Sequence, residues 1–230
     1  MIPQQDELQL TSSLSLRSQW AGLAETLRGS VKRAIDFSGA LVGLLLLTPV
    51  MLAVAVLIRL DSPGPIFFRQ LRRGYRGRLF WVIKFRTMVV DAEKKLGDLE
   101  QKNESAGGVL FKMRDDPRVT PLGRFLRKSS LDELPQLINI LRGEMSVVGP
   151  RPLQLRDSEM LQSLDAEGYR RRLQVMPGLT GPWQVGGRSG VDYARMVELD
   201  VHYANNWSIL GDLVIIARTF VAVIVGRGAC

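Results

Sequence analysis

The sequence has very little of the two residues that most often bind zinc or form cross-links. Its 230 residues include one cysteine, Cys230, and one histidine, His202. A single cysteine excludes a disulfide within the chain, and nothing here indicates an oxidising compartment. A zinc site needs about four nitrogen or sulfur ligands, or three and a water. Any metal that the chain binds is therefore expected to be a hard cation with oxygen ligands, such as Mg2+.

Acidic residues are outnumbered by basic ones, 23 against 31, which gives a formal net charge of +8. This charge indicates an anionic partner: nucleic acid, anionic lipid or a phosphate-bearing substrate. The charge alone does not choose among them. The sequence lacks the aromatic-rich strand motif, the zinc-ligand spacing and the recognition-helix pattern of known nucleic-acid-binding modules. We therefore expect no nucleic-acid partner.

The chain has one long uncharged run, residues 37–58 (FSGALVGLLLLTPVMLAVAVLI). As a helix, these 22 residues would span about 33 Å, enough to cross a bilayer core of about 30 Å. Basic residues dominate both flanks, because residues 17–33 hold four of them against Glu25 and residues 59–86 hold eight against Asp61. Basic flanks favour the cytoplasmic side of a membrane. The charge pattern therefore favours a helix that enters and leaves on the same face.

Thr48 and Pro49 lie at the middle of this run. Proline removes a backbone hydrogen bond, and Thr48 can hydrogen-bond a freed carbonyl, so we expect a kink here. We predict a monotopic membrane protein with a kinked, re-entrant helix over residues 31–60. A polar N-terminal extension, residues 1–30, precedes it, and a cytoplasmic domain, residues 61–230, follows. The alternative is an ordinary single-pass helix with a proline kink.

The rest of the chain predicts a helix-rich α/β domain with a small sheet. Apolar residues on both sides of the GYRGR turn predict a strand hairpin over residues 66–83. Residues 119–142 have helical periodicity, which is interrupted at Ser129, Ser130 and Pro135. Residues 91–108 are expected to form a helix followed by a mobile loop, and further helices are expected in residues 155–175 and 210–225. The last of these is too short and too charged to span, so it is expected at the membrane surface or in the core.

Two adjacent acids, Asp132 and Glu133, precede Pro135. Proline is comfortable only in the first turn of a helix, so both acids are expected at or near a helix N-terminus. The helix dipole and free N–H groups there keep a carboxylate ionised and can receive a phosphate, which suits a nucleophile. The alternative is a capping box, in which Ser130 and Glu133 only cap the helix. Spacing alone favours capping.

A phosphoryl-transfer site also needs cations that neutralise the phosphates. The chain has five basic residues near turns or element ends: Lys84, Arg86, Arg127, Arg151 and Arg188. Each of them, taken alone, is more typical of a surface or lipid-headgroup contact. Their recurrence beside glycine and proline loops favours a common site only modestly.

Several motifs occur in a recognisable order. They are residues 84–88 (KFRTM), 115–120 (DDPRVT), 123–127 (GRFLR), 131–136 (LDELPQ), 149–152 (GPRP) and 177–181 (PGLTG). Over about residues 31–225 the chain therefore resembles the bacterial sugar transferase family, the monotopic polyprenyl-phosphate phosphoglycosyl transferases.

The resemblance implies a catalytic domain on the cytoplasmic face of the bacterial inner membrane, with a C-terminal interfacial helix. It implies transfer of a sugar 1-phosphate from a UDP-sugar to undecaprenyl phosphate, with release of UMP, in the assembly of surface polysaccharides or glycoconjugates. Membrane lipids are implied partners. A homodimer stays open, as does the sugar.

The family's residues carry over to specific positions. Asp132 matches the nucleophile of a two-step reaction through an aspartyl phosphosugar intermediate, and it is the expected Mg2+ contact. Glu133 matches the partner acid. Three cations match positions expected to hold phosphates: Lys84, Arg127 and Arg151. Arg188 lies in the WQVGGR stretch that corresponds to a family motif.

Two other functions would explain parts of the pattern. A non-enzymatic, membrane-anchored basic protein that binds anionic lipid or nucleic acid would explain the charge, but it would not need the Asp–Glu pair. A glycosyl transferase would move the sugar without its phosphate, and a D-x-D metal motif would favour it. The sequence has no such motif. Released UMP would indicate phosphosugar transfer, and released UDP would indicate glycosyl transfer.

Overall fold

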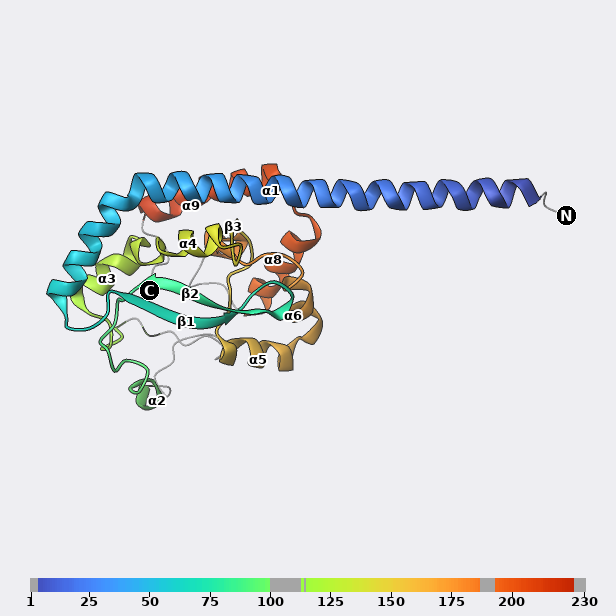
Figure 1. The fold of residues 1–230 in the computed structure, drawn as a ribbon. Helices are drawn as coiled ribbons and strands as arrows, with labels where there is room; N and C mark the ends of the chain where they lie inside the picture. Colours follow the sequence, from blue (N-terminus) through green and yellow to red (C-terminus); the bar gives the residue numbers. More distant parts are fainter. Residues whose placement is uncertain (1–3, 100–112, 114, 187–192, 226–230) are drawn as a thin grey trace.

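The computed structural model describes residues 4–99, 113, 115–186 and 193–225. Its longest element is α1 (Gln4–Asp61), a single helix of 58 residues. Figure 1 shows α1 lying along one face of the domain, with its N-terminal half extending beyond the other elements. From Gln4 onward, the predicted N-terminal extension is therefore part of the same helix as the apolar run.

One stretch of α1, Thr26–Asp61, is long and apolar enough to cross a membrane. Figure 1 shows α1 changing direction near its C-terminal end, where the ribbon passes from blue to cyan, and Pro49 lies inside the helix. The Thr48 hydroxyl donates to the Leu44 carbonyl at 2.6 Å. Pro49 has no N–H, so the carbonyl that it frees is that of Leu45. Thr48 bonds the Leu44 carbonyl instead, so the prediction that Thr48 bonds the freed carbonyl is wrong. The re-entrant topology stays a prediction.

The predicted hairpin is confirmed. Strands β1 (Phe67–Arg73) and β2 (Leu79–Phe85) pair antiparallel around the short helix η1 (Tyr75–Gly77). Asn139, which is fully buried, accepts from the Ile83 N–H at 3.1 Å and donates to the Trp81 carbonyl at 2.7 Å. One amide side chain thus fixes the free edge of β2 to the helix behind it.

Residues 119–142 form three short helices, with the breaks where the sequence predicts them. They are α3 (Pro121–Lys128), η3 (Leu131–Glu133) and α4 (Gln136–Leu141). Thr120 begins α3 by accepting from the Gly123 N–H at 3.0 Å. Gly143, with φ +76°, ends α4 in a left-handed turn.

The second half of the domain is more divided than expected. The single helix predicted over residues 155–175 is wrong: α5 (Leu155–Leu164) and α6 (Ala166–Arg172) are separated by Asp165. The Asp165 carboxylate accepts from the Gly168 N–H at 2.8 Å, so it starts a new helix instead of continuing the old one. The remaining elements are α2 (Leu96–Leu99), β3 (Ser146–Val148), β4 (Gly178–Thr180), α7 (Pro182–Val185), α8 (Tyr193–Asn205) and α9 (Ile209–Val225).

The helix-rich α/β fold is confirmed, with two small sheets in the described residues instead of one. The hairpin is one sheet, and β3 pairs parallel with β4 to form the other. The core lies between α1, β2 and α4, where Ala40, Val82 and Ile140 are buried together. In Figure 1, α9 and α1 lie on the same side of the domain, and Lys32 of α1 pairs with Asp212 of α9. Large apolar side chains of α9 such as Leu210 and Phe220 are exposed, and its place at a membrane surface stays a prediction.

Candidate active site

Asp132 and Glu133 lie in η3, between α3 and α4. Ser130 precedes them with a left-handed backbone (φ 58°, ψ 16°), and its hydroxyl caps no helix. Pro135 occupies the N-cap position of α4, so both acids precede that helix. The capping-box alternative is wrong, because Ser130 ends α3 with its left-handed backbone and the Glu133 carboxylate binds two basic side chains instead.

Glu133 holds two cations together. Its Oε1 accepts from Lys84 Nζ and from Arg151 Nη2, both at 2.7 Å. Lys84 lies on β2 and Arg151 shortly follows β3, so these bonds join both sheets to η3. Burial would raise the pKa of Glu133, but Arg151 and Lys84 together lower it well below its usual range. Glu133 therefore stays ionised.

Asp132 is a buried acid whose carboxylate has no hydrogen bond or ion pair within the described residues. Burial raises its pKa to about 6, Lys84 acts against this, and the ionised Glu133 raises the pKa further. Arg127 and Arg151 are also close enough to favour the charged form. At neutral pH the carboxylate is thus ionised, surrounded by cations, and free to bond to a substrate.

Thr87 fixes α3, and with it Arg127, against the hairpin. Its hydroxyl accepts from Arg127 Nε at 3.0 Å, and its carbonyl accepts from the Thr120 N–H at 3.1 Å. A Cβ on Gly123 would lie 2.0 Å from the Thr87 carbonyl oxygen. Glycine is therefore required where the two backbones meet, and the position of Arg127 depends on it.

Backbone contacts between two glycine-rich segments hold the loop of Arg151. The Gly149 N–H donates to the Thr180 carbonyl at 2.9 Å, and a Cβ on Gly181 would lie 2.2 Å from the Gly149 oxygen. Arg172 Nη2 donates to the Arg151 carbonyl at 2.9 Å. The GPRP and PGLTG motifs thus form one support for the Arg151 side chain.

Among the described cations, Arg86 bonds away from this site. The Arg86 guanidinium donates to the carbonyls of Ser62 and Pro63, at 2.7 and 2.9 Å. It braces the turn after α1 and makes no hydrogen bond or ion pair to Asp132 among the described residues. The geometry gives no support to Arg86 as a phosphate ligand. Arg188 lies outside the described residues.

Two residues near the site were not predicted, the half-buried Arg72 and the buried Asp157. Arg72 Nη1 donates to the Pro152 carbonyl at 2.8 Å, which brings its charge near Arg151. Burial raises the pKa of Asp157 to about 6, and Arg72 opposes the shift. Strand alternation gives a signal for Arg72, because Arg72 and Lys84 share the face of the hairpin that is turned toward the core.

Comparison with known proteins decides the family. Residues 27–226 match the family model described as bacterial sugar transferase. The chain belongs to the bacterial sugar transferase family. It is therefore an enzyme, a transferase, and the alternative of a non-enzymatic basic membrane protein is set aside.

The relatives of this bacterial sugar transferase differ in length and named sugar. The exopolysaccharide production protein ExoY of Sinorhizobium fredii is 44% identical over 214 residues, which are 92% of this chain and 93% of that protein. The UDP-glucose:undecaprenyl-phosphate glucose-1-phosphate transferase of Escherichia coli is 40% identical over 86% of this chain. The undecaprenyl-phosphate galactose phosphotransferase of Salmonella typhimurium is 39% identical over the same share. The chain spans 41% of the length of each of these last two relatives.

The residues of this sugar transferase fit one kind of magnesium site. Mg2+ is usually held by one or two carboxylates together with substrate phosphates and waters. Asp132 provides one such carboxylate, buried and without a bond of its own in the described chain. No cluster of three acidic, histidine or cysteine ligands occurs among the described residues. The site thus fits Mg2+ shared with a bound diphosphate, and it does not fit a metal enclosed by protein ligands alone.

Proposed function

We propose that the chain transfers a sugar 1-phosphate from a UDP-sugar to a polyprenyl phosphate and releases UMP, with Asp132 as the nucleophile. The observation that carries the proposal is the Asp132 carboxylate, which is buried, has a pKa of about 6, and lies close to Lys84, Arg127 and Arg151. The names of relatives that use undecaprenyl phosphate support the same donor and acceptor classes.

In the first step, a carboxylate oxygen of Asp132 attacks the sugar-bearing phosphorus of the UDP-sugar. The new oxygen–phosphorus bond forms as the bond to the uridine phosphate breaks, so UMP leaves. Lys84 and Arg151 stabilise the charge that builds up on the phosphoryl oxygens, while Glu133 keeps these two cations in place. Arg127, held by Thr87, adds a further positive charge near Asp132.

In the second step, an oxygen of the polyprenyl phosphate attacks the same phosphorus. The bond to Asp132 breaks, and the carboxylate returns to its starting state. The product is a polyprenyl diphosphate sugar. Mg2+, held by Asp132 and the diphosphate, would neutralise negative charge on the donor when bound. We place this reaction at the cytoplasmic face of the bacterial inner membrane, in the initiation of surface glycan assembly.

The released nucleotide tests the proposal. Purified protein in nanodiscs, with polyprenyl phosphate and Mg2+, is expected to release UMP from at least one member of a panel of UDP-sugars. Each sugar is run with and without the lipid phosphate, and the nucleotide is identified by chromatography. Release of UDP in place of UMP would indicate glycosyl transfer, and it would overturn the phosphosugar reaction.

The pH dependence of the first step is expected to follow the ionisation of Asp132. Because its pKa is about 6 and only the carboxylate attacks phosphorus, the rate should fall about tenfold per unit below pH 6 and level off above it. The measurement is the single burst of UMP in the absence of lipid, since the acceptor phosphate itself titrates near pH 6. A rate that does not change between about pH 4.5 and 7 would contradict this assignment.

A further inference from the structure

Three charged residues of α1 lie directly before its uncharged run: Lys32, Arg33 and Asp36. Here they are called the clasp, because all three bond to the backbone of the catalytic domain. Arg33 donates to the carbonyls of Ile140 and Leu141, at 2.6 and 2.9 Å, at the C-terminal end of α4. A cation at this end of a helix satisfies free carbonyls and complements the helix dipole.

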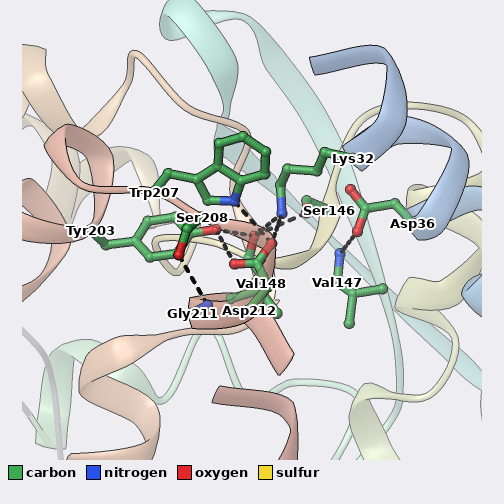
Figure 2. Close-up of polar contacts among 10 residues, drawn as sticks. All are labelled: Lys32, Asp36, Ser146, Val147, Val148, Tyr203, Trp207, Ser208, Gly211 and Asp212. Carbon is green, nitrogen blue, oxygen red and sulfur yellow. Dashed lines mark hydrogen bonds and ion pairs between the residues drawn. The ribbon is translucent and has the colours of Figure 1, made fainter. Parts of the chain in front are cut away.

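The other two residues of the clasp bind β3. Asp36 Oδ1 accepts from the Val147 N–H at 2.9 Å, and Lys32 Nζ donates to the Val148 carbonyl at 3.2 Å. Figure 2 shows both side chains reaching from α1 toward this strand. The clasp therefore forms hydrogen bonds with the end of α4 and with β3, the strand that follows it.

A second set of contacts connects Lys32 of the clasp to α9. Lys32 pairs with Asp212 of α9 at 2.5 Å, and the two side chains are only 17% and 12% exposed. Trp207 Nε1 donates to Asp212 at 3.0 Å, and the Tyr203 hydroxyl donates to Asp212 at 2.8 Å and lies 3.0 Å from the Val148 oxygen. The groups converge in Figure 2. A pair with so little exposure and so many partners is held in a single geometry, so it can fix the distance between α1 and α9.

The segment that the clasp contacts, from the end of α4 to β3, lies in the sequence between the two parts of the active site. Asp132 and Glu133 come just before α4, and Arg151 comes three residues after Val148. The membrane-facing helix is thus bonded to the chain midway between the nucleophile and a cation that binds phosphate. The same three α1 side chains immediately precede the run that would enter the membrane.

We propose that Lys32, Arg33 and Asp36 are positioning residues that fix the active site relative to the membrane helix, so that a membrane-embedded lipid phosphate reaches Asp132 correctly. This proposal rests on the proposed function. The nucleotide sugar is soluble, so its binding does not depend on where the site lies relative to the membrane. The lipid phosphate is confined to the membrane surface, so its approach depends on how α1 and the catalytic domain are joined.

Lys32→Met is expected to slow transfer to polyprenyl phosphate in nanodiscs by about ten- to a hundredfold, because a displacement of about 1 Å has effects of this size. The burst of UMP without lipid is expected to keep its rate. A short-chain, water-soluble prenyl phosphate should be used nearly as well as by the wild type. Arg28→Met is the matched control, since Arg28 is an exposed cation one turn earlier in α1.

Trp207→Phe is a milder second variant: it puts a phenyl ring in place of the indole ring that lies 5.4 Å from Lys32, and it removes one bond to Asp212. It should shift acceptor use in the same direction by a smaller factor. Equal losses with embedded and soluble acceptors, or no loss in either variant, would overturn the proposal.

Amide hydrogen exchange tests the contacts of the clasp independently of enzyme activity. Because Asp36 accepts from the Val147 N–H, the peptide that contains Val147 is expected to exchange faster in Asp36→Ala than in Arg28→Met, and unchanged exchange would overturn the clasp. A wild type that releases no UMP from any donor would instead refute the proposed function, and the exchange result would still decide whether the clasp holds β3.

Discussion

Asp132→Asn is expected to abolish sugar-phosphate transfer, with a loss of about 10^4-fold or more in UMP release. Asparagine has the shape of aspartate, but its amide cannot form the bond to phosphorus on which both proposed steps depend. The measurement is UMP release with each donor that the wild type uses, in the presence and absence of lipid phosphate. Asp165→Asn is the control, because Asp165 is an exposed helix cap and asparagine caps equally well.

The same substitution separates a catalytic loss from a folding defect. The folded-state pKa of Asp132 is raised to about 6 from 3.8, so its ionised form destabilises the fold above pH 6. Asp132→Asn should therefore unfold at a higher temperature than the wild type at pH 7.5. The difference should shrink as the pH falls from about 6 toward 4, because the folded-state carboxyl becomes protonated over this range, and it should vanish below 3.8, where the carboxyl is protonated in both states. An inactive variant with a lower melting temperature at pH 7.5 would leave the nucleophile assignment without support.

The structure confirms part of the sequence argument for the nucleophile region and corrects another part. The pattern around Pro135 located a break before α4, and this break is present. The capping alternative failed because hydrogen-bond partners of Glu133 come from β2 and from the loop after β3, far away in sequence. Spacing within one segment cannot report such partners. A capping box and a site of paired charges look alike until the strands are placed.

The cations show the same limit. Lys84, Arg127 and Arg151 were predicted beside Arg86, and all four stand next to turns in the sequence. Only the fold distinguishes them, because Lys84 lies on β2 and turns to Glu133, whereas Arg86 lies just after the end of β2 and turns back to the carbonyls after α1. Strand alternation cannot predict that difference, because residues two apart would share a face of the strand.

The membrane helix shows what composition can and cannot give. Length and apolar content identified the run that begins after Asp36, and charge flanks suggested its topology. Lys32 and Arg33 were counted only as flanking charges, which would be solvated or near lipid headgroups. The structure gives each of them a backbone carbonyl of the catalytic domain as a partner. Counting charges cannot reveal this, because the partners lie more than a hundred residues away.

Glu133→Gln is expected to lower activity by about 10^2- to 10^3-fold, a loss typical of removing a preorganised charge from an active site. The carboxylate now holds Lys84 and Arg151, and a neutral amide cannot balance two partly buried cations. Removing the charge from these partly buried pairs also lowers the stability, so the melting temperature should fall. Glu167→Gln is the matched control, because Glu167 also binds two arginines but is 55% exposed, and it should change neither quantity.

The pH profile of this variant distinguishes a role in positioning cations from a merely structural one. Ionised Glu133 raises the pKa of Asp132, and it occupies the two cations that would otherwise favour the charged Asp132. Without it, Lys84 and Arg151 should turn toward Asp132 and lower that pKa below 6. The acidic limb of the UMP burst should then move to lower pH while its plateau falls, because an aspartate paired with two cations is a weaker nucleophile. A plateau that falls while the limb stays near pH 6 would mean that Glu133 supports the fold without controlling the charge of the nucleophile.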